Sequence, residues 1–159
     1  TVLQFANVDA ELYGMDIEWG YELAESWRLD GTVSYVRGRR RDGGGDNLYR
    51  IAPLNTRAQL TFDQDNWSIA AEVEAYTAQN DVAEYNAEMK SAGYGLLHIR
   101  GEIQPTQGFN LGLGIENILD KNYADHTAAI NRVMGSDVAV NKKVPAHGRN
   151  IYLTASYAW

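Results

Sequence analysis

The sequence lacks the features that define several common classes of protein. It contains no cysteine, which excludes a disulfide framework and a thiolate metal site. No run of about 18 or more apolar residues occurs, so no transmembrane helix is expected. Thr1 opens directly into the chain without a signal-peptide pattern. The net charge of −7 argues against a nucleic-acid partner.

Aromatic residues with a polar edge are the first positive signal. The chain has 10 tyrosines and 4 tryptophans but only 3 phenylalanines, and such amphipathic rings are typical of a membrane interface. The mean hydropathy of −0.40 would by itself suggest a soluble protein. The pattern along the chain therefore has to decide between a membrane protein and a soluble one.

The dominant pattern is an alternation of apolar and polar residues with a period of two. Between residues 13 and 23 every odd position is apolar or aromatic, and every even position is Gly, Asp or Glu. This alternation predicts β-strands. Strands of about ten residues, as here, are longer than the usual five or six and suit a tilted crossing of a bilayer. The remaining predicted strands cover 27–35, 54–63, 67–76, 97–104, 109–116 and 150–159, and residues 1–8 leave room for the end of another.

The connections between these strands alternate between short and long. Short connections lie at 24–26, 64–66 and 105–108, and long ones cover roughly 37–51, 78–93 and 119–148. Outer-membrane barrels alternate in this way, with short periplasmic turns and long external loops. The apolar faces carry no charge, but a soluble sheet would share that property, so the loop alternation carries the prediction. The sequence thus predicts an all-β, antiparallel transmembrane β-barrel with about seven or eight strands here.

The aromatic residues agree with this arrangement of the strands. Most of the large rings lie close to the short turns, where one interfacial girdle is expected, and Tyr13, Tyr35 and Tyr94 lie near the long connections, where the other belongs. The polar faces carry about a dozen charges. A wide, wet lumen holds so many charges more easily than a small closed barrel, which is filled by side chains.

Several motifs resemble the C-terminal end of TonB-dependent outer-membrane receptors. Residues 114–126 read GIENILDKNYADH, residues 144–152 read VPAHGRNIY, and residues 7–16 read NVDAELYGMD. The chain departs from the family pattern in having Pro-Ala-His-Gly-Arg where Pro-Gly-Arg is usual, and Trp159 where Phe is usual. The resemblance covers essentially the whole chain.

The resemblance implies a larger assembly. In this family a barrel of about 22 strands surrounds a plug. Residues 1–159 would be the C-terminal segment of one barrel domain, with the plug outside this sequence, Trp159 as the natural end and Thr1 as an artificial beginning. The implied location is the bacterial outer membrane. The implied partners are lipid and lipopolysaccharide, TonB through the missing N-terminal part, a transported metal or chelate, and the barrel assembly machinery, whose signal Tyr157 and Trp159 match.

Two groups of residues are candidate sites in the external loops. Residues 131–138, NRVMGSDV, resemble copper-type receptors, and methionine and histidine suit copper. The candidate ligands in this last external loop are Asp125, His126, Met134 and His147, although their loose spacing also fits a polar loop with scattered histidines. The second group is a basic cluster, predicted to lie in an external loop, which is either solvated or contacts anionic headgroups or a charged ligand. It consists of Arg37, Arg39, Arg40 and Arg41.

No catalytic site is predicted, and no cofactor. The serines lie in no nucleophile motif, and Glu72 and Glu74 on one strand face fit a hydrated wall. The favoured hypothesis is an energised uptake receptor for a metal or metal chelate. The alternatives are a passive outer-membrane channel or adhesin barrel, and a soluble lipocalin-type binder.

Overall fold

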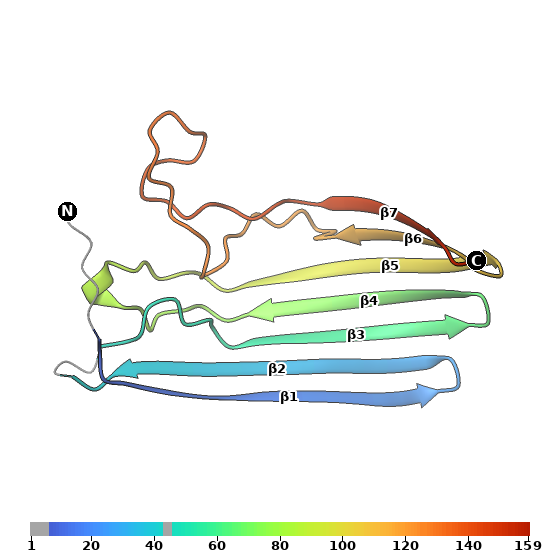
Figure 1. Ribbon diagram of the computed structural model, residues 1–159, viewed down its shortest axis with the longest axis horizontal. Coiled ribbons are helices and arrows are strands. Elements are labelled where there is room, and N and C mark those ends of the chain that lie inside the picture. Colours follow the sequence, from blue (N-terminus) through green and yellow to red (C-terminus); the bar gives the residue numbers. More distant parts are fainter. Residues whose placement is uncertain (1–6, 43–45) are drawn as a thin grey trace.

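The computed structural model describes residues 7–42 and 46–159 (Figure 1). It contains one seven-stranded sheet in which every strand pairs antiparallel with the next one along the chain, in the order β1 to β7. This confirms the all-β prediction. Of the strand end predicted at 1–8, residues 1–6 lie outside the described residues, and Asn7 and Val8 precede β1. The elements are β1 (Ala10–Ala24), β2 (Trp27–Arg40), β3 (Asn55–Gln64), β4 (Trp67–Tyr76), the 3₁₀ helix η1 (Glu84–Asn86), β5 (Tyr94–Thr106), β6 (Phe109–Glu116) and β7 (Asn150–Tyr157).

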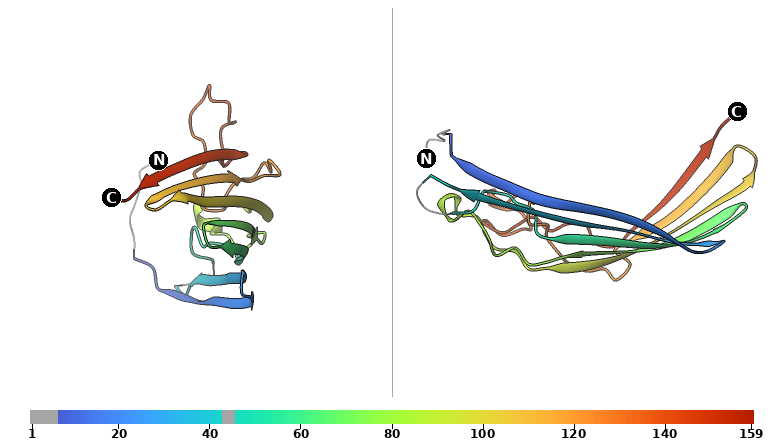
Figure 2. Two further views of the ribbon diagram at one scale, coloured as in Figure 1. Left: turned by 90° about the vertical axis from the view of Figure 1, so that its right-hand side faces the viewer. Right: turned by 90° about the horizontal axis from the view of Figure 1, so that it is seen from below.

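The sheet is twisted and strongly curved (Figure 2). Its outer strands are β1 and β7, which lie at opposite edges of the sheet order. A meander of long, tilted neighbours that curves without closing has the shape of a segment of barrel wall. It does not have the form of a small closed barrel.

The pairing register keeps the two faces of the sheet chemically distinct. Ile17 lies opposite Val33 on one face, and the next position places Asp16 opposite Ser34 on the other. A slip of one residue would move every side chain of a strand to the wrong face, so this alternation fixes the register. We call the two surfaces the apolar face and the polar face. The apolar face includes Ile17, Val33, Val73, Leu113 and Leu153, and the polar face includes Asp16, Glu72, His98, Arg100 and Thr154.

The apolar face is not covered by any part of the described chain. Side chains in the middle of the strands remain open there, with Val73 at 50%, Leu113 at 53% and Leu153 at 72% exposure. The few buried apolar residues are mostly small or in loops, and among the described residues they are Ala70, Val82, Ala83 and Leu96. A soluble sheet buries its apolar face against another layer. This sheet therefore needs an apolar environment outside the chain.

Within the described parts of the chain, no helix is long and apolar enough to span a membrane.

Short and long connections lie at opposite ends of the sheet (Figure 1). Two-residue turns at 25–26, 65–66 and 107–108 join the strands at one end, and the long connections gather at the other. The predicted alternation is therefore confirmed. The last long connection, residues 117–149, projects past the β7 edge of the sheet (Figure 1).

The first long connection begins later than predicted. The β1–β2 ladder continues to the pair Ala10–Arg40, so Arg37, Arg39 and Arg40 lie in a strand and not in a loop. The placement of this basic cluster in an external loop was thus wrong for three of its four residues. Alternation in hydrophobicity fades after Tyr35, whereas the backbone ladder does not depend on it.

Aromatic rings near the short turns form a continuous row on the apolar face. Trp27, Phe62 and Trp67 come from three neighbouring strands, and their ring centroids lie 4.8 and 5.4 Å apart. This row agrees with the predicted girdle. The prediction that Tyr94 belongs to the opposite girdle was wrong, because its register with Tyr76 places both rings on the polar face. Their rings stack there, with centroids 4.6 Å apart.

Candidate functional site

Charged side chains of β3, β4 and β5 form a network on the polar face. Register places Arg57 directly opposite Glu74, and the two are joined by a 3.1 Å ion pair. Glu72, whose side chain is 5% exposed, accepts from Arg100 and also lies 3.6 Å from Arg57. Arg100 donates to Gln59 as well. Two carboxylates and two guanidiniums are thus interleaved across three strands.

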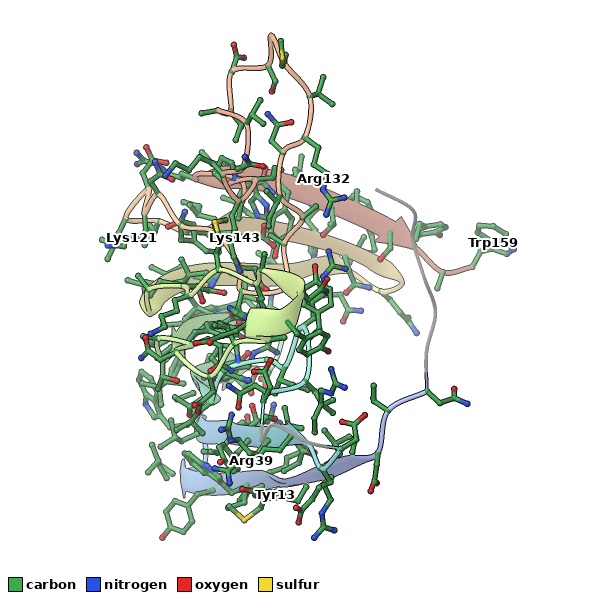
Figure 3. All side chains as sticks on the ribbon, turned by 90° about the vertical axis from the view of Figure 1, so that its left-hand side faces the viewer. Tyr13, Arg39, Lys121, Arg132, Lys143 and Trp159 are labelled. Carbon is green, nitrogen blue, oxygen red and sulfur yellow. The ribbon has the colours of Figure 1, made fainter. Side chains whose placement is uncertain are left out.

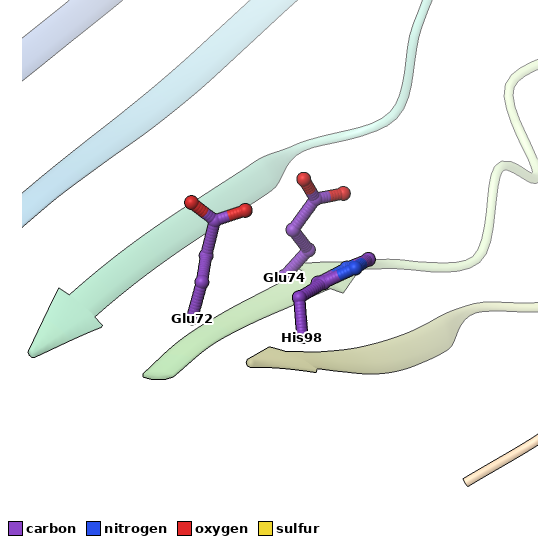
Figure 4. Close-up of side chains that lie close together, drawn as sticks. All are labelled: Glu72, Glu74 and His98. Carbon is purple, nitrogen blue, oxygen red and sulfur yellow. The ribbon is translucent and has the colours of Figure 1, made fainter. Parts of the chain in front are cut away.

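His98 brings an imidazole against these carboxylates (Figure 4). One ligand atom from each of Glu72, Glu74 and His98 lies within 4.8 Å of the others, which is the geometry of a possible metal site. His98 Nε2 is buried, and it has no hydrogen-bond partner among the described residues. Proximity alone would therefore suggest a divalent cation.

The hydrogen bonds and charges around this group argue against a cation. His98 Nδ1 accepts the backbone N–H of Asn117 at 3.3 Å, so Nε2 carries the ring hydrogen and offers a donor in place of a lone pair. Both carboxylates are already neutralised by Arg57 and Arg100. We therefore interpret Glu72, Glu74 and His98 as a polar wall with a donor free to meet an acceptor, in agreement with the expectation of a hydrated wall.

A second polar cluster joins the two long connections beyond β4 and β6. His126 is 4% exposed, and its ring lies between Ser91, whose Oγ is 2.9 Å from Nδ1, and Glu88, whose Oε1 is 3.1 Å from Nε2. Since a carboxylate accepts from Nε2–H, Nδ1 accepts from the Ser91 hydroxyl. Glu88 also accepts the backbone N–H groups of Arg50 and Ala83. His126 therefore fixes the 117–149 connection to the 77–93 connection.

Burial and hydrogen bonds shift the pKa values of the groups in this cluster. Burial, and then the ammonium of Lys143, hold the pKa of His126 below its ordinary value, although Glu88 acts in the opposite direction. Burial also lowers the pKa of Lys143, which donates to the His126 carbonyl. Burial alone would raise the pKa of Asp125, but hydrogen bonds from Thr127 and Tyr94 outweigh it and hold that pKa low.

We expect the contact between the two long connections to weaken in acid. Because the folded pKa of His126 lies below its ordinary value, about 6.5, the stability it contributes is complete above that pH and is lost as pH falls through the folded pKa. The hydrogen-exchange protection of residues 84–92 in the full-length receptor, which is the intrinsic exchange rate at each pH divided by the observed rate, should therefore fall between neutral pH and pH 5. His126→Gln should remove this pH dependence and His147→Gln should retain it. An unchanged profile in His126→Gln would assign the effect to another group.

The predicted copper ligands are not gathered at one point. Asp125 accepts from Tyr94 and Thr127, and His126 is occupied by Glu88 and Ser91. Met134 is 85% exposed, and His147 lies 3.7 Å from Glu116. Among the described residues, the only cluster of three His, Asp or Glu side chains with metal-ligand proximity is the one on the polar face. Asp125, His126, Met134 and His147 thus share one long connection without sharing one site.

The two long connections enclose a pocket that the sequence did not indicate. Its volume is about 680 Å³, within the range of small-molecule sites. Lysines outnumber acids around it, with Asp137 as the acidic residue, and Tyr94 and Tyr123 supply rings whose centroids are 4.5 Å apart. Two of the lysines are labelled in Figure 3. The lysines are Lys90, Lys121, Lys142 and Lys143. Only the folding of the two connections brings residues so distant in sequence together.

The basic cluster is largely paired with acidic residues. Arg37 is buried and lies 3.1 Å from Asp81, and Arg40 lies 2.9 Å from Asp42. Arg41 lies 3.9 Å from Glu11, and Arg39 is exposed directly across the ladder from Glu11. The pair of Arg37 and Asp81 joins β2 to the 77–93 connection, whereas the other pairs lie within the β1–β2 end itself. They leave little unbalanced positive charge for an anionic ligand.

The assembly-signal residues lie at the end of the last strand. Tyr157 ends β7 and is 60% exposed, and Trp159 extends beyond it and is fully exposed (Figure 3). Their ring centroids are 6.4 Å apart. Both rings are thus accessible at the short-turn end of the sheet.

The sheet is curved and antiparallel, with an uncovered apolar face, a charged polar face and long loops at one end. These features define a wall segment of an outer-membrane β-barrel. The family model described as "TonB dependent receptor-like, beta-barrel" matches residues 1–118. The chain belongs to this family, whose members are proteins of the bacterial outer membrane. The family comprises receptors and not enzymes, which confirms that expectation.

Solved structures of receptors resemble the chain closely. The structure described as "Copper transporter OprC" matches with a TM-score of 0.90 and 26% identity, over 96% of this chain and 24% of that one. The ferric yersiniabactin uptake receptor FyuA from Yersinia pestis matches with a TM-score of 0.69 and 14% identity, over 93% and 23%. A mutant of the ferric enterobactin receptor PfeA from Pseudomonas aeruginosa matches with a TM-score of 0.67 and 19% identity, over 93% and 22%.

The chain therefore spans about a quarter of the length of the receptors it matches. A comparison with curated proteins gave no significant match.

Proposed function

We propose that the chain is the C-terminal wall and external loops of a TonB-dependent receptor that imports a metal or metal chelate, with copper as the first candidate. One observation carries the copper assignment. The match to a copper transporter covers nearly the whole chain at 26% identity, whereas the ferric yersiniabactin and ferric enterobactin receptors match at 14% and 19%. Plug and TonB contact would be supplied by the rest of the receptor.

The last long connection is the part of the chain best suited to meet a ligand. Met134 and His147 are exposed, and thioether sulfur and imidazole nitrogen suit copper. His126 and Asp125 are occupied within the chain, so their proposed part is to hold the connection in place. The lysine-lined pocket beside it favours a negatively charged chelate. The wall and the loops thus offer contacts for either form of the metal.

Uptake measurements test the TonB-dependent import and the copper assignment. Cells that express the full-length receptor should accumulate radioactive copper only when TonB is present. The double variant Met134→Ala, His147→Ala should lower this accumulation about tenfold, equivalent to about 1.4 kcal/mol of binding, and Val133→Ala in the same connection should not. Copper uptake without TonB would indicate a passive channel. Uptake of a ferric catecholate but not of copper would retain the receptor and overturn the copper assignment.

The terminal aromatic residues should be needed for assembly. A charge in place of the exposed Tyr157, or deletion of Trp159, removes an interfacial ring from the last strand. We expect Tyr157→Asp and the Trp159 deletion to lower the amount of heat-modifiable, folded receptor in outer membranes, while Tyr157→Phe keeps it. Normal amounts in both altered receptors would show that the assembly machinery does not use these rings.

A further inference from the structure

Two glycines in the interior of the sheet are covered by an aromatic ring from the neighbouring strand. The indole of Trp19 lies over Gly31 on the apolar face, and a Cβ at Gly31 would come within 2.2 Å of it. The ring of Tyr152 lies in the same way over Gly114 on the polar face, at 2.1 Å. Such coverage is a known means of stabilising a glycine in a sheet. At these two positions the chain itself fills the space.

Gly101, in the middle of β5, has no such ring over it. It faces the apolar side between Ile69 and Leu113, and the nearest atom to a Cβ built there is the Ser68 carbonyl oxygen, at an ordinary 3.5 Å. A larger side chain would therefore fit. A glycine inside a strand costs roughly 0.5–1 kcal/mol relative to alanine, and nothing in the described chain requires it here.

The missing side chain opens a groove across β4 to β7. Ile69 and Leu113 flank Gly101 across the strands, and Ile99 and Ile103 flank it along β5. The groove has a volume of about 470 Å³. Its remaining apolar lining comes from Trp67, Leu111, Ile115 and Leu153.

The position of the groove indicates its occupant. It is continuous with the apolar face, which the outer-membrane location places against lipid. Trp67, at one end of the groove, begins β4 immediately after a short turn, and tryptophan marks the level of the headgroups. Short turns of such barrels face the periplasm, where the leaflet in contact is phospholipid.

We propose that the groove over Gly101 binds one acyl chain of a phospholipid from the periplasmic leaflet. This acyl chain would cover Gly101 as Trp19 covers Gly31. Because an acyl chain is flexible and wholly apolar, it can follow a groove formed by isoleucine and leucine side chains without leaving a polar group unpaired. The proposal depends on the outer-membrane location and not on the transported ligand.

Photolabelling tests the site in the full-length receptor. The receptor is reconstituted in vesicles of phosphatidylethanolamine that contain a trace of the same lipid with a diazirine in its acyl chain. We expect labelling of Ile69, Ile103 and Leu113 to exceed severalfold that of apolar-face residues near the short turns of β1 and β2. Gly101→Leu should reduce it to their level, and Gly101→Ala should reduce it in part.

A matched control lies on the same strand. Gly95 also faces the apolar side of β5 with an ordinary 3.6 Å contact, but it lies outside the groove, so Gly95→Leu should leave the labelling unchanged. Even labelling of the wild-type receptor, or an unchanged pattern in Gly101→Leu, would overturn the proposal. A wild-type dimer that Gly101→Leu converts to a monomer would assign the groove to a second receptor and would also overturn it.

Discussion

Leu153→Arg should lower the free energy of unfolding of the full-length receptor in lipid vesicles by about 2–4 kcal/mol, and Thr154→Arg should lower it by less than about 1 kcal/mol. The two residues are neighbours in β7 and point to opposite faces. Leu153 is 72% exposed on the apolar face, where an arginine would have to be buried in hydrocarbon. Thr154 faces the polar side, where a guanidinium can remain hydrated.

Denaturant unfolding of the two variants measures this difference directly, with loss of heat-modifiable receptor as a second readout. Leu153→Lys should behave like Leu153→Arg, since the cost arises from charge and not from shape. Equal effects of arginine at 153 and at 154 would contradict the assignment of the apolar face to lipid. A larger loss of unfolding free energy for Thr154→Arg than for Leu153→Arg would mean that the polar face, and not the apolar face, lies against lipid.

Removing Glu72 from the ion network on the polar face should also cause a large loss of unfolding free energy. Glu72→Ala leaves Arg100 without its carboxylate and removes one of two carboxylates near Arg57. We expect a loss of about 1–3 kcal/mol in unfolding free energy, below the cost of breaking a fully buried pair because both arginines are partly exposed. Glu74→Ala should cost less, since Glu74 has one arginine partner and Tyr76.

A double-mutant cycle separates the network from simple loss of side chains. Glu72→Ala combined with Arg100→Ala should cost less than the sum of the two single variants, because neither charge is then left without its partner. Denaturant midpoints at constant slope supply the values. Strict additivity would mean that Glu72 and Arg100 do not stabilise one another.

The strands could be predicted from the sequence because the two faces of each strand lie in different environments, one apolar and one polar. Alternation at 67–76 and 109–116 gave both ends of β4 and β6 correctly. Boundaries failed where the alternation faded but backbone pairing continued, as in the part of β2 from Val36 to Arg40. Tyr94 was assigned to the wrong face for a related reason, since the strand was predicted to begin only at residue 97.

The candidate sites were less predictable, because their residues lie far apart in the chain. His126 suggested a metal ligand, yet its partners Glu88 and Ser91 lie more than thirty residues away and use both ring nitrogens. The lysine-lined pocket likewise needs residues from two long connections. Loop residues carry no periodicity from which such contacts could be inferred.

By itself, the sequence determined that this chain forms long antiparallel strands with one apolar and one charged face, joined alternately by short turns and long loops. Period-two patterning is local, so it can be recognised in each strand without knowing which strands pair with it. Only the tertiary structure decided which groups meet across strands and loops. The pairing of Glu72 with Arg100, the position of His126 between two loops, and the uncovered Gly101 all depend on register and loop packing, which place distant residues within a few ångströms of each other.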